Sequence, residues 1–176
     1  MLPGVIKLER LHAGHAAALL AFERENRAYF ARSVPDRGDA YFDDFASRLR
    51  ALLAEQDAGV CHFHVVVDDR DDLVGRVNLL DAVEGTAELG YRIAERAAGR
   101  GVATAAVAQA RRLAGTVYGL SALTARTTLD NVASRTVLER NGFTVVGDVR
   151  LDGRPGLRYR GVTRSGDCGA PPGEGR

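Results

Sequence analysis

The segment RAAGRG (96–101) carries the clearest potential for chemistry in the sequence, and the Ala-rich run VATAAVAQA follows it at once. Two glycines one residue apart, between a predicted strand and a predicted helix, let the backbone approach an anion closely. The first amides of the following helix have no partner inside that helix, so they can donate to a phosphate. We interpret the segment as a pyrophosphate cradle, and a plain tight turn is the alternative for an isolated GxG pattern.

Two other phosphate-binding motifs do not fit this segment. A P-loop would need Gly-Lys-Ser or Gly-Lys-Thr at the start of the helix, and neither tripeptide occurs there. A dinucleotide fingerprint beginning at Gly99 would need Gly or Ala at position 104, where the sequence has Thr104. A dehydrogenase with a nucleotide cofactor is therefore disfavoured.

A second block, NVASRTVLERNGF (131–143), completes a family resemblance. The pattern Arg-x-x-Gly-x-Gly at 96–101 resembles the acetyl-CoA pyrophosphate motif of the GNAT superfamily, and the strand ELGYRI (88–93) precedes it as in that family. The second block resembles the signature of the ribosomal-protein alanine N-acetyltransferases, the Rim type. The resemblance covers residues 5–163 and implies an enzyme that transfers an acetyl group from its co-substrate acetyl-CoA to a primary amine, by direct attack in a ternary complex.

The resemblance also implies which residues meet acetyl-CoA. Main-chain groups of the strand would pair with the pantetheine arm as an added strand does. Amides of the loop and helix start would hold the pyrophosphate, with charge added by an arginine. The side chain of Asn131 would bind the pantetheine, although a helix N-cap is the alternative for it. The residues expected at the co-substrate are Tyr91, Arg92, Ile93, Arg96, Gly99, Arg100, Gly101, Val102, Ala103, Thr104, Asn131 and Ser134.

Three residues are expected to be catalytic. Ser134 lies one helical turn after Asn131, and in the Rim type this serine is near the thioester sulfur, where it can protonate the CoA thiolate. Many other members use a tyrosine for this task at a position where this sequence has Leu138. Glu88 is our first choice for the general base that frees the amine of its proton, with a solvated edge residue as its alternative reading. Asp152 is our second choice, close to a Rim-type glutamate whose matching position is Gly153.

The acceptor is less clear from the sequence. Acidic side chains cluster in the region that flanks the substrate groove in this family, where they could attract a cationic amine or form a solvated face. These side chains belong to Glu23, Glu25, Asp36, Asp39, Asp43 and Asp44. The segment ENRAYF (25–30) is similar to Rim-type sequences and favours a protein N-terminal α-amine. A small amine such as an aminoglycoside, polyamine or amino acid is an alternative, and so is a non-catalytic acetyl-CoA-binding module.

The elements that must position these residues follow from hydrophobic periodicity and turn residues. We expect an α/β fold with a GNAT-like mixed central sheet of about six to seven strands, flanked by about four helices. Gly115 is expected to end the third helix as its C′ residue, and 152–156 to form the loop of a final hairpin. The predicted strands are 5–8, 61–67, 73–80, 87–93, 120–127, 143–149 and 157–163, and the predicted helices are 13–30, 42–53, 102–113 and 131–140.

Size and composition suit a globular enzyme. The chain has 176 residues, 45% of them hydrophobic and 27% charged. We expect one acetyltransferase domain over 1–164 and a flexible Gly/Pro-rich tail over 165–176. A net charge of +1 without a long basic run disfavours nucleic acid as a partner. No stretch approaches the roughly 18 apolar residues of a membrane span, and no signal peptide is apparent, so we expect a cytoplasmic protein with no membrane partner.

The cysteines and histidines indicate no further chemistry. Cys61 and Cys168 lie far apart and are expected to be free thiols. His62 and His64 would share one face of a strand. Because neither Cys nor carboxylate stands near them at ligand spacing, no metal site is expected. Exposed apolar residues on the second helix or the last strands could support a homodimer.

Overall fold

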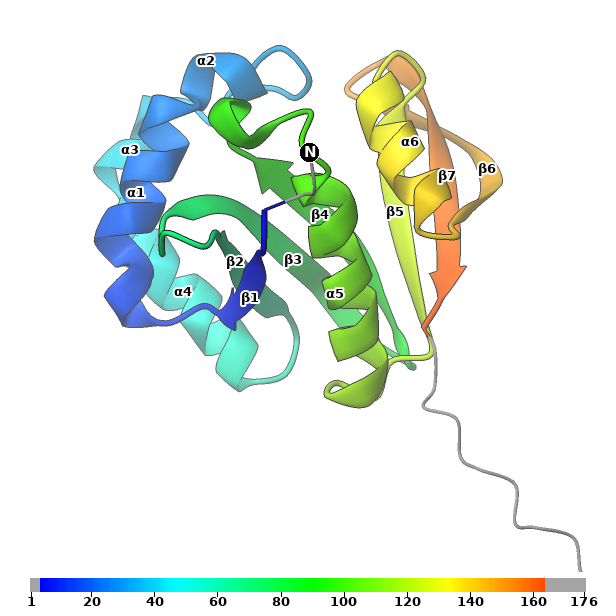
Figure 1. The fold of residues 1–176 in the computed structure, drawn as a ribbon, viewed down its shortest axis with the longest axis horizontal. Coiled ribbons are helices and arrows are strands. Elements are labelled where there is room, and N and C mark those ends of the chain that lie inside the picture. Colours follow the sequence, from blue (N-terminus) through cyan, green and yellow to red (C-terminus); the bar gives the residue numbers. More distant parts are fainter. Residues whose placement is uncertain (1–3, 164–176) are drawn as a thin grey trace, which may run out of the picture.

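A single mixed sheet of strand order β1-β2-β3-β4-β5-β7-β6 organises the molecule (Figure 1). The structure, a computed structural model, describes residues 4–163. The tail expected at 165–176 lies outside the described residues, as does Cys168. The strands are β1 (Lys7–Arg10), β2 (His62–Val67), β3 (Leu73–Val83), β4 (Thr86–Ile93), β5 (Ala122–Thr128), β6 (Thr144–Leu151) and β7 (Arg154–Val162).

Helices cover both faces of this sheet. Four of them pack on one face around Phe22, Phe45 and Phe63, and two pack on the other around Val107 and Leu138. Figure 1 shows the first four gathered on one side of β1 to β4, with α5 on the opposite side. The helices are α1 (Ala16–Glu25), α2 (Arg27–Phe30), α3 (Asp39–Asp43), α4 (Phe45–Asp57), α5 (Val102–Thr116) and α6 (Val132–Arg140). Among the described residues, none of these helices is long and apolar enough to cross a membrane.

The feature that creates the site is the divergence of β4 and β5. These strands pair in parallel from Thr86 and Ala122 only as far as Glu88 and Thr124. Beyond that point β4 stays paired with β3 as far as Ile93, while β5 continues beside β7. The last residues of β4 therefore keep one edge without a strand partner within the described part of the chain.

Two predicted helices are divided, which explains the six helices where about four were expected. The region 13–30 forms a short 3-10 turn (Ala13–His15), α1 and α2, with a break at Asn26. The side chain of Asn26 donates to the carbonyl of Phe22 at 2.9 Å and accepts from the amide of Glu95 at 2.9 Å. These bonds tie the break to the loop before α5. The second predicted helix begins at Phe45 and is preceded by the separate helix α3.

The other predicted elements are present, with shifted ends. The prediction that Gly115 ends its helix is wrong, because α5 continues to Thr116. The buried Ala114 keeps this turn packed on the sheet, and the left-handed residue is Gly119, with φ 66°. The final hairpin turns more tightly than expected, since only Asp152 and Gly153 separate β6 from β7.

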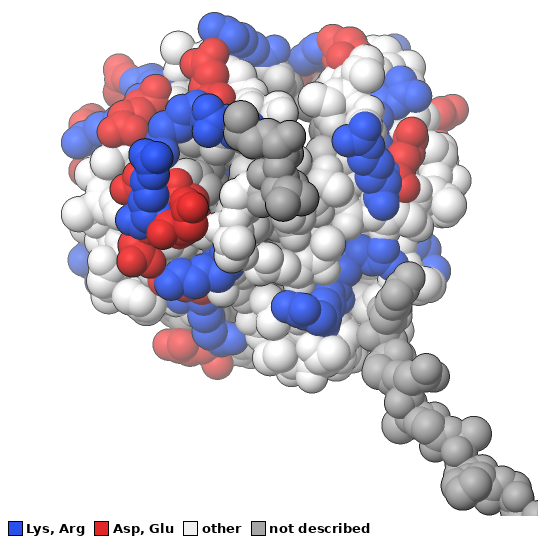
Figure 2. Space-filling model, in the orientation of Figure 1, with Lys and Arg blue, Asp and Glu red and all other residues white. Residues whose placement is uncertain are grey.

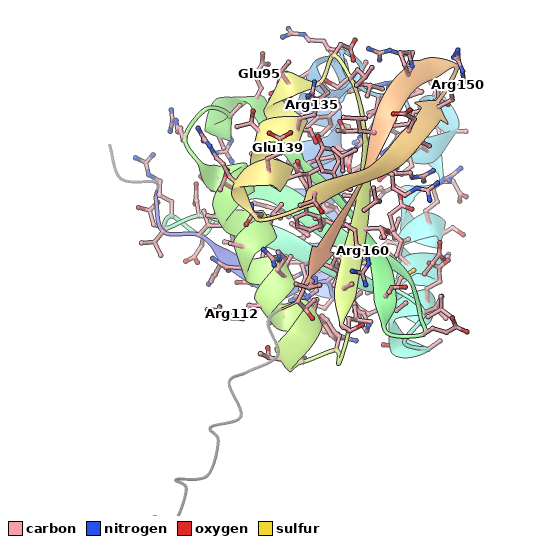
Figure 3. The ribbon with its side chains drawn as sticks, turned by 90° about the vertical axis from the view of Figure 1, so that its right-hand side faces the viewer. Glu95, Arg112, Arg135, Glu139, Arg150 and Arg160 are labelled. Atoms are coloured by element: carbon pink, nitrogen blue, oxygen red, sulfur yellow. The ribbon has the colours of Figure 1, made fainter. Side chains whose placement is uncertain are left out.

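Charge is unevenly distributed over the face shown in Figure 2. Side chains of both signs gather over the helices α1 to α4, while the middle of this face, over α5, is mostly uncharged. Figure 3 shows α6, with Arg135 and Glu139, beside the final hairpin, which presents Arg150 from β6 and Arg160 from β7. Both charged and apolar side chains are exposed here, among them Val145 and Val146.

Candidate active site

Two cavities meet where β4 and β5 diverge. The wedge cavity, of about 750 Å³, is lined by the diverging strands, the β6–β7 turn and the segment after α2. The loop cavity, of about 500 Å³, is lined by the end of β4, the start of α5 and one side of α6. The residues that line both are Ser33, Val34, Tyr91, Arg92, Asn131 and Ser134. A ligand in one cavity can therefore touch a ligand in the other.

The loop cavity contains the predicted anion cradle. Gly99 and Gly101 have φ values of 72° and 75°, in the left-handed region that favours glycine. Gly101 is the N-cap of α5, and the first backbone bond of the helix runs from the amide of Ala105 to the carbonyl of Gly101. The preceding amides at 102–104 are left for a ligand, and all three residues line the cavity. This arrangement suits a phosphate or pyrophosphate.

The free edge of β4 forms the second wall of the loop cavity. Tyr91, Arg92 and Ile93 line it, as the sequence predicted, and they lie beyond the last residue of β4 that pairs with β5. An extended ligand that contains amides can add to such an edge as a strand would. The cavity therefore offers a phosphate site at one end and an amide-pairing edge at the other.

Of the arginines, Arg92 and Arg140 line the loop cavity, while the two predicted to add charge lie outside its lining. Arg96 and Arg100 are exposed and do not line the loop cavity. The guanidinium of Arg96 lies 3.8 Å from the carboxylate of Asp72 and 3.4 Å from the carbonyl of Leu73. Arg140 lines the cavity from the end of α6 instead. Sequence reasoning missed it because a basic residue in a last helical turn is common on its own account.

The start of α6 brings Ser134 to the junction of the cavities. Asn131 caps this helix, since its side-chain oxygen accepts from the amide of Ser134 at 3.1 Å, and it also lines both cavities. The Ser134 hydroxyl lies 2.9 Å from the hydroxyl of Tyr91. Burial raises the pKa of Tyr91, while the bond to Ser134 lowers it less. Tyr91 is therefore a protonated phenol within reach of Ser134, a side-chain role that sequence reasoning missed.

The two candidate bases differ in how they face the wedge cavity. Asp152 lines the cavity from the β6–β7 turn, in a left-handed conformation with φ 49°. Glu88 does not line it. Its carboxylate accepts from Arg126 at 3.0 Å and 2.9 Å, and Arg126 does line the cavity. Glu88 thus lies one ion pair away from the space that an amine would occupy.

A buried carboxylate lies behind one wall of the wedge cavity, where it binds three arginines. Glu23, on α1, is 1% exposed and binds Arg76 at 2.9 Å, Arg92 at 3.4 Å and Arg37 at 3.5 Å. All three arginines line the wedge cavity, and Asn78 lies beside them. This wall is therefore positive.

The sequence suggests that a group of acidic residues could attract a cationic amine. Three of these residues already pair with arginines in the structure, so they give this suggestion no support. Glu23 is occupied by the three arginines. Arg27 binds Asp36 at 2.6 Å and Asp39 at 2.8 Å. This hydrogen bonding lowers the pKa of Asp36 to about 2. The remaining residues, Glu25, Asp43 and Asp44, are exposed.

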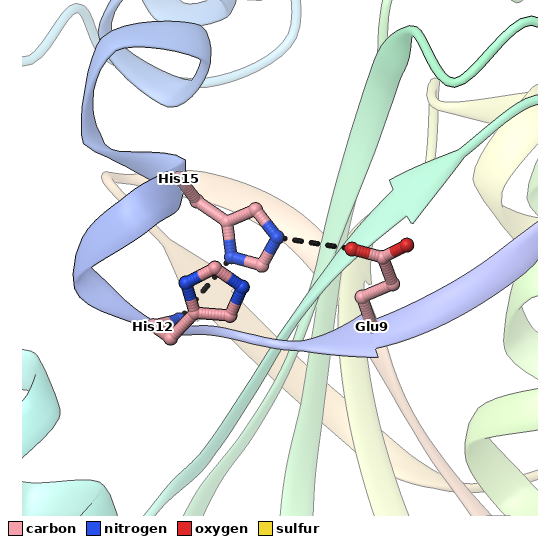
Figure 4. A group of neighbouring side chains, drawn as sticks. All are labelled: Glu9, His12 and His15. Atoms are coloured by element: carbon pink, nitrogen blue, oxygen red, sulfur yellow. Dashed lines mark hydrogen bonds and ion pairs between the residues drawn. The ribbon is translucent and has the colours of Figure 1, made fainter.

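A cluster of Glu9, His12 and His15 has the composition of a metal site, but the Nδ1 atom of each ring already accepts a backbone hydrogen bond (Figure 4). The Nδ1 atoms of His12 and His15 accept from the amides of Gly14 and His12, at 3.0 Å and 3.2 Å. That leaves the hydrogen on Nε2, which in His15 faces the carboxylate of Glu9 at 3.1 Å. Coordination through Nε2 would require Nδ1 to carry the hydrogen and give up its backbone bond. The cluster is explained as a cap of the following helix.

The other histidines and the described cysteine lie outside both cavities. His62 stacks on Tyr118 with ring centroids 3.7 Å apart, and Nε2 of His64 lies 2.7 Å from the Tyr118 hydroxyl. Cys61 is a buried free thiol, and burial raises its pKa. The prediction of a free thiol is thus confirmed for Cys61.

The diverging strands, the glycine cradle at a helix start and the free strand edge together define a transferase of the CoA-binding α/β type. Residues 6–144 match the acetyltransferase (GNAT) domain. The chain belongs to the GNAT acetyltransferases, as the segments RAAGRG and NVASRTVLERNGF indicated.

Solved structures of this family share the fold over almost the whole chain. The ribosomal-protein-S5-alanine acetyltransferase from Vibrio fischeri has a TM-score of 0.83 at 19% identity, over 90% of this chain and 93% of that chain. Mycobacterium smegmatis RimJ, in complex with CoA-disulfide, has a TM-score of 0.82 at 25% identity, over 91% and 83%. Spermidine N-acetyltransferase from Vibrio cholerae, with CoA and spermine, has a TM-score of 0.73 at 20% identity, over 90% and 95%. A search of curated sequences gave no match.

Proposed function

We propose that the protein transfers the acetyl group of acetyl-CoA to a primary amine by direct attack in a ternary complex. The observation that carries this proposal is the meeting of the two cavities at Tyr91 and Ser134. A thioester reaching the junction from the loop cavity would meet an amine in the wedge cavity. Bringing both reactants to one point removes much of the entropic barrier of a bimolecular reaction.

The loop cavity fits acetyl-CoA. Amides at 102–104 would bind the pyrophosphate, and the edge of β4 at 91–93 would pair with the amides of pantetheine. Arg140 would add charge beside the phosphates, with Arg96 and Arg100 near enough in sequence to contribute from the loop. The complex of RimJ with CoA-disulfide supports this choice of co-substrate. When bound, acetyl-CoA supplies an activated acyl group.

The hydroxyls at the junction suit the departure of the thiolate. As the amine nitrogen bonds to the acyl carbon and the carbon–sulfur bond breaks, the sulfur leaves with the electron pair and needs a proton. Ser134 would give it that proton, and Tyr91 would replace the proton on Ser134. Because its pKa is raised, Tyr91 would then take a proton back from water and end the cycle as a neutral phenol. Leu138, where other members of the family have an acid, has no proton to give. The Cys61 thiol lines neither cavity, so we assign no acyl-enzyme.

The amine must lose a proton, and the two carboxylates predicted from the sequence remain our candidates. Asp152 has the better position, since it lines the wedge cavity directly. Glu88 would act through Arg126 or through water, because Arg126 holds its carboxylate. We therefore place Asp152 first, which reverses the order expected from the sequence.

For the acceptor we propose a protein N-terminal α-amine, with a small amine as the alternative. The similarity of ENRAYF (25–30) to Rim-type sequences and the names of the V. fischeri and M. smegmatis enzymes support the first. The spermidine acetyltransferase and the microcin C7 self-immunity acetyltransferase MccE support the small amine as the alternative acceptor.

We also propose that residues 1–164 form a single domain and that the protein can form a homodimer.

The test is thiol release from acetyl-CoA in the presence of N-terminal peptides, amino acids, polyamines and aminoglycosides. We expect acetyl-CoA to bind in calorimetry and at least one amine to stimulate release of CoA with formation of its acetamide. Binding of acetyl-CoA without stimulation by any of these amines would contradict the transferase and leave a binding module.

A further inference from the structure

The wedge cavity carries more positive charge than its carboxylates balance. Of the described residues that line it, five are arginines and one, Asp152, is a carboxylate. Two of these arginines have a carboxylate of their own, because Arg126 pairs with Glu88 and Arg154 pairs with Asp130. The other three, which we call the Arg37–Arg76–Arg92 cluster, share the single carboxylate of Glu23.

Burial strengthens the electrostatic effect of this excess positive charge. The Glu23 side chain is 1% exposed and that of Arg76 is 6% exposed, while those of Arg92 and Arg37, which also line the cavity, are 22% and 31% exposed. Charges that water screens poorly interact more strongly than surface charges. The pKa of Arg92 is lowered, first by burial and then by the charge of Arg37. A guanidinium still keeps its charge at neutral pH, so two positive charges stay unbalanced in this wall.

An unused polar atom lies beside the cluster. Asn78 lines the wedge cavity, and its side-chain Oδ1 is buried without a hydrogen-bond partner among the described residues. Asn78 and Arg76 are on β3, opposite Gly90 and Arg92 of β4. A buried polar atom without a partner is costly unless a ligand or water satisfies it. The wall therefore offers an acceptor for an amine N–H next to donors for an anion.

We propose that the acceptor amine carries an anionic group, a carboxylate or a phosphate, which the Arg37–Arg76–Arg92 cluster binds. This inference rests on the proposed function and narrows its acceptor. The planar guanidinium of arginine can donate two parallel hydrogen bonds to a carboxylate or a phosphate. A polyamine, which is positively charged, would be repelled by the arginines of this wall. Such an acceptor includes a free amino acid, a phosphorylated amine and a peptide with an acidic residue near its N-terminus.

The test compares acceptors in pairs that differ by the anion. Thiol release is measured with O-phosphoethanolamine and ethanolamine, with alanine and alaninamide, and with Ala-Glu and Ala-Gln peptides amidated at the C-terminus, beside spermidine. We expect kcat/KM to be higher for the anionic member of at least one pair by about tenfold or more, with spermidine poor. The pair that shows the preference identifies the source of the anion.

Variants assign the preference to the cluster. Arg37→Gln should raise KM for the anionic acceptor about tenfold and leave KM for acetyl-CoA unchanged, since Arg76 and Arg92 still balance Glu23. Arg37→Glu should reverse the preference toward spermidine. The matched control is Arg32→Gln, because Arg32 is exposed, binds Glu95 at 3.4 Å and lines neither cavity.

Two results would overturn the proposal. One is equal kcat/KM for both members of every pair in the parent enzyme, and the other is a preference that survives in Arg37→Gln and Arg37→Glu. Failure of the proposed function is recognised separately, by calorimetry of the CoA-loaded protein. Binding of O-phosphoethanolamine but not ethanolamine, without turnover of any amine, would support the anion site and contradict the transferase. Equal or no binding of the two members in every one of the pairs would contradict the anion site.

Discussion

At the scale of single residues, the proposed proton donors are two hydroxyls at the junction of the cavities, where the family resemblance implies a helix tyrosine in many other members. Leu138 is 1% exposed and belongs to the core, so α6 contributes apolar packing at that position. The phenol comes instead from β4, where Tyr91 reaches Ser134 at 2.9 Å. Ser134 could be predicted from its motif. The part of Tyr91 could not, because it depends on the gap between strands that are far apart in sequence.

Removal of either hydroxyl should slow chemistry while leaving binding intact. We expect Ser134→Ala and Tyr91→Phe each to lower the single-turnover rate about tenfold, near the lower end of general-acid effects, because a thiolate is a fairly good leaving group. Acetyl-CoA affinity in calorimetry should be nearly unchanged. The double variant should lose little more than either single one, because the two groups act as a unit.

Thr116→Ala controls for the loss of a hydroxyl outside the site. Its hydroxyl donates to the carbonyl of Arg112 at the end of α5. A Ser134→Ala enzyme as fast as the parent at saturating acetyl-CoA and acceptor would leave Ser134 as a helix residue only, and the acid would then be water.

The choice of base is also decided at this scale. Asp152→Asn should lower kcat/KM at neutral pH by about 10²-fold or more, as expected for a lost general base, with acetyl-CoA binding preserved. Glu88→Gln should have a smaller effect, since it first frees Arg126. The pH–rate profile checks this, because loss of a base removes the acidic limb of the profile. Full activity of Asp152→Asn over the whole pH range would return the role to Glu88 or to solvent.

At the scale of elements, we propose that the glycine cradle and the start of α5 bind an anion as one unit. A β-branched side chain resists the left-handed φ of 75° at Gly101. We expect Gly101→Val to weaken acetyl-CoA binding in calorimetry by about tenfold or more, since the loop must open or turn its amides away from the cavity. Gly59→Val is the matched control, because Gly59 has φ 73°, follows α4 and lines neither cavity.

The control separates strain from binding. Both variants should lose stability by a similar amount in thermal unfolding, and only Gly101→Val should lose affinity. An unchanged affinity in folded Gly101→Val would remove the pyrophosphate from this loop.

Most elements could be predicted from the sequence because they carry their own periodicity and turn residues. The strands and the helices α5 and α6 follow from these local patterns. The break at Asn26 does not, because the bond from the Glu95 amide to Asn26 is made across the fold. The same limit applied to charge. The sequence places Glu23 among acidic residues that could attract an amine or form a solvated face, whereas in the fold it is the buried partner of three arginines.

At the scale of the whole molecule, the sheet divides function from stability. The diverging end of β4 and β5 holds the cavities, while β2 forms a closed part of the sheet in which all residues but His62 are buried. His64 lies in this closed part, 3% exposed, with Nε2 at 2.7 Å from the Tyr118 hydroxyl. Its Nδ1 atom is buried without a partner among the described residues. A neutral ring fits this place and a charged one does not.

Stability should therefore fall in mild acid through His64. Burial, helped by the charge of Arg10, lowers its pKa from the usual 6.5 to about 4 in the folded state. Between these values the unfolded chain takes up a proton that the folded chain refuses, so the free energy of unfolding falls as pH drops below 6.5. Urea titrations should show a loss of up to about 2 kcal/mol between about pH 7 and pH 5. His64→Gln should lose less over this range than the parent, and an equal loss in His64→Gln would assign the acid sensitivity to another group.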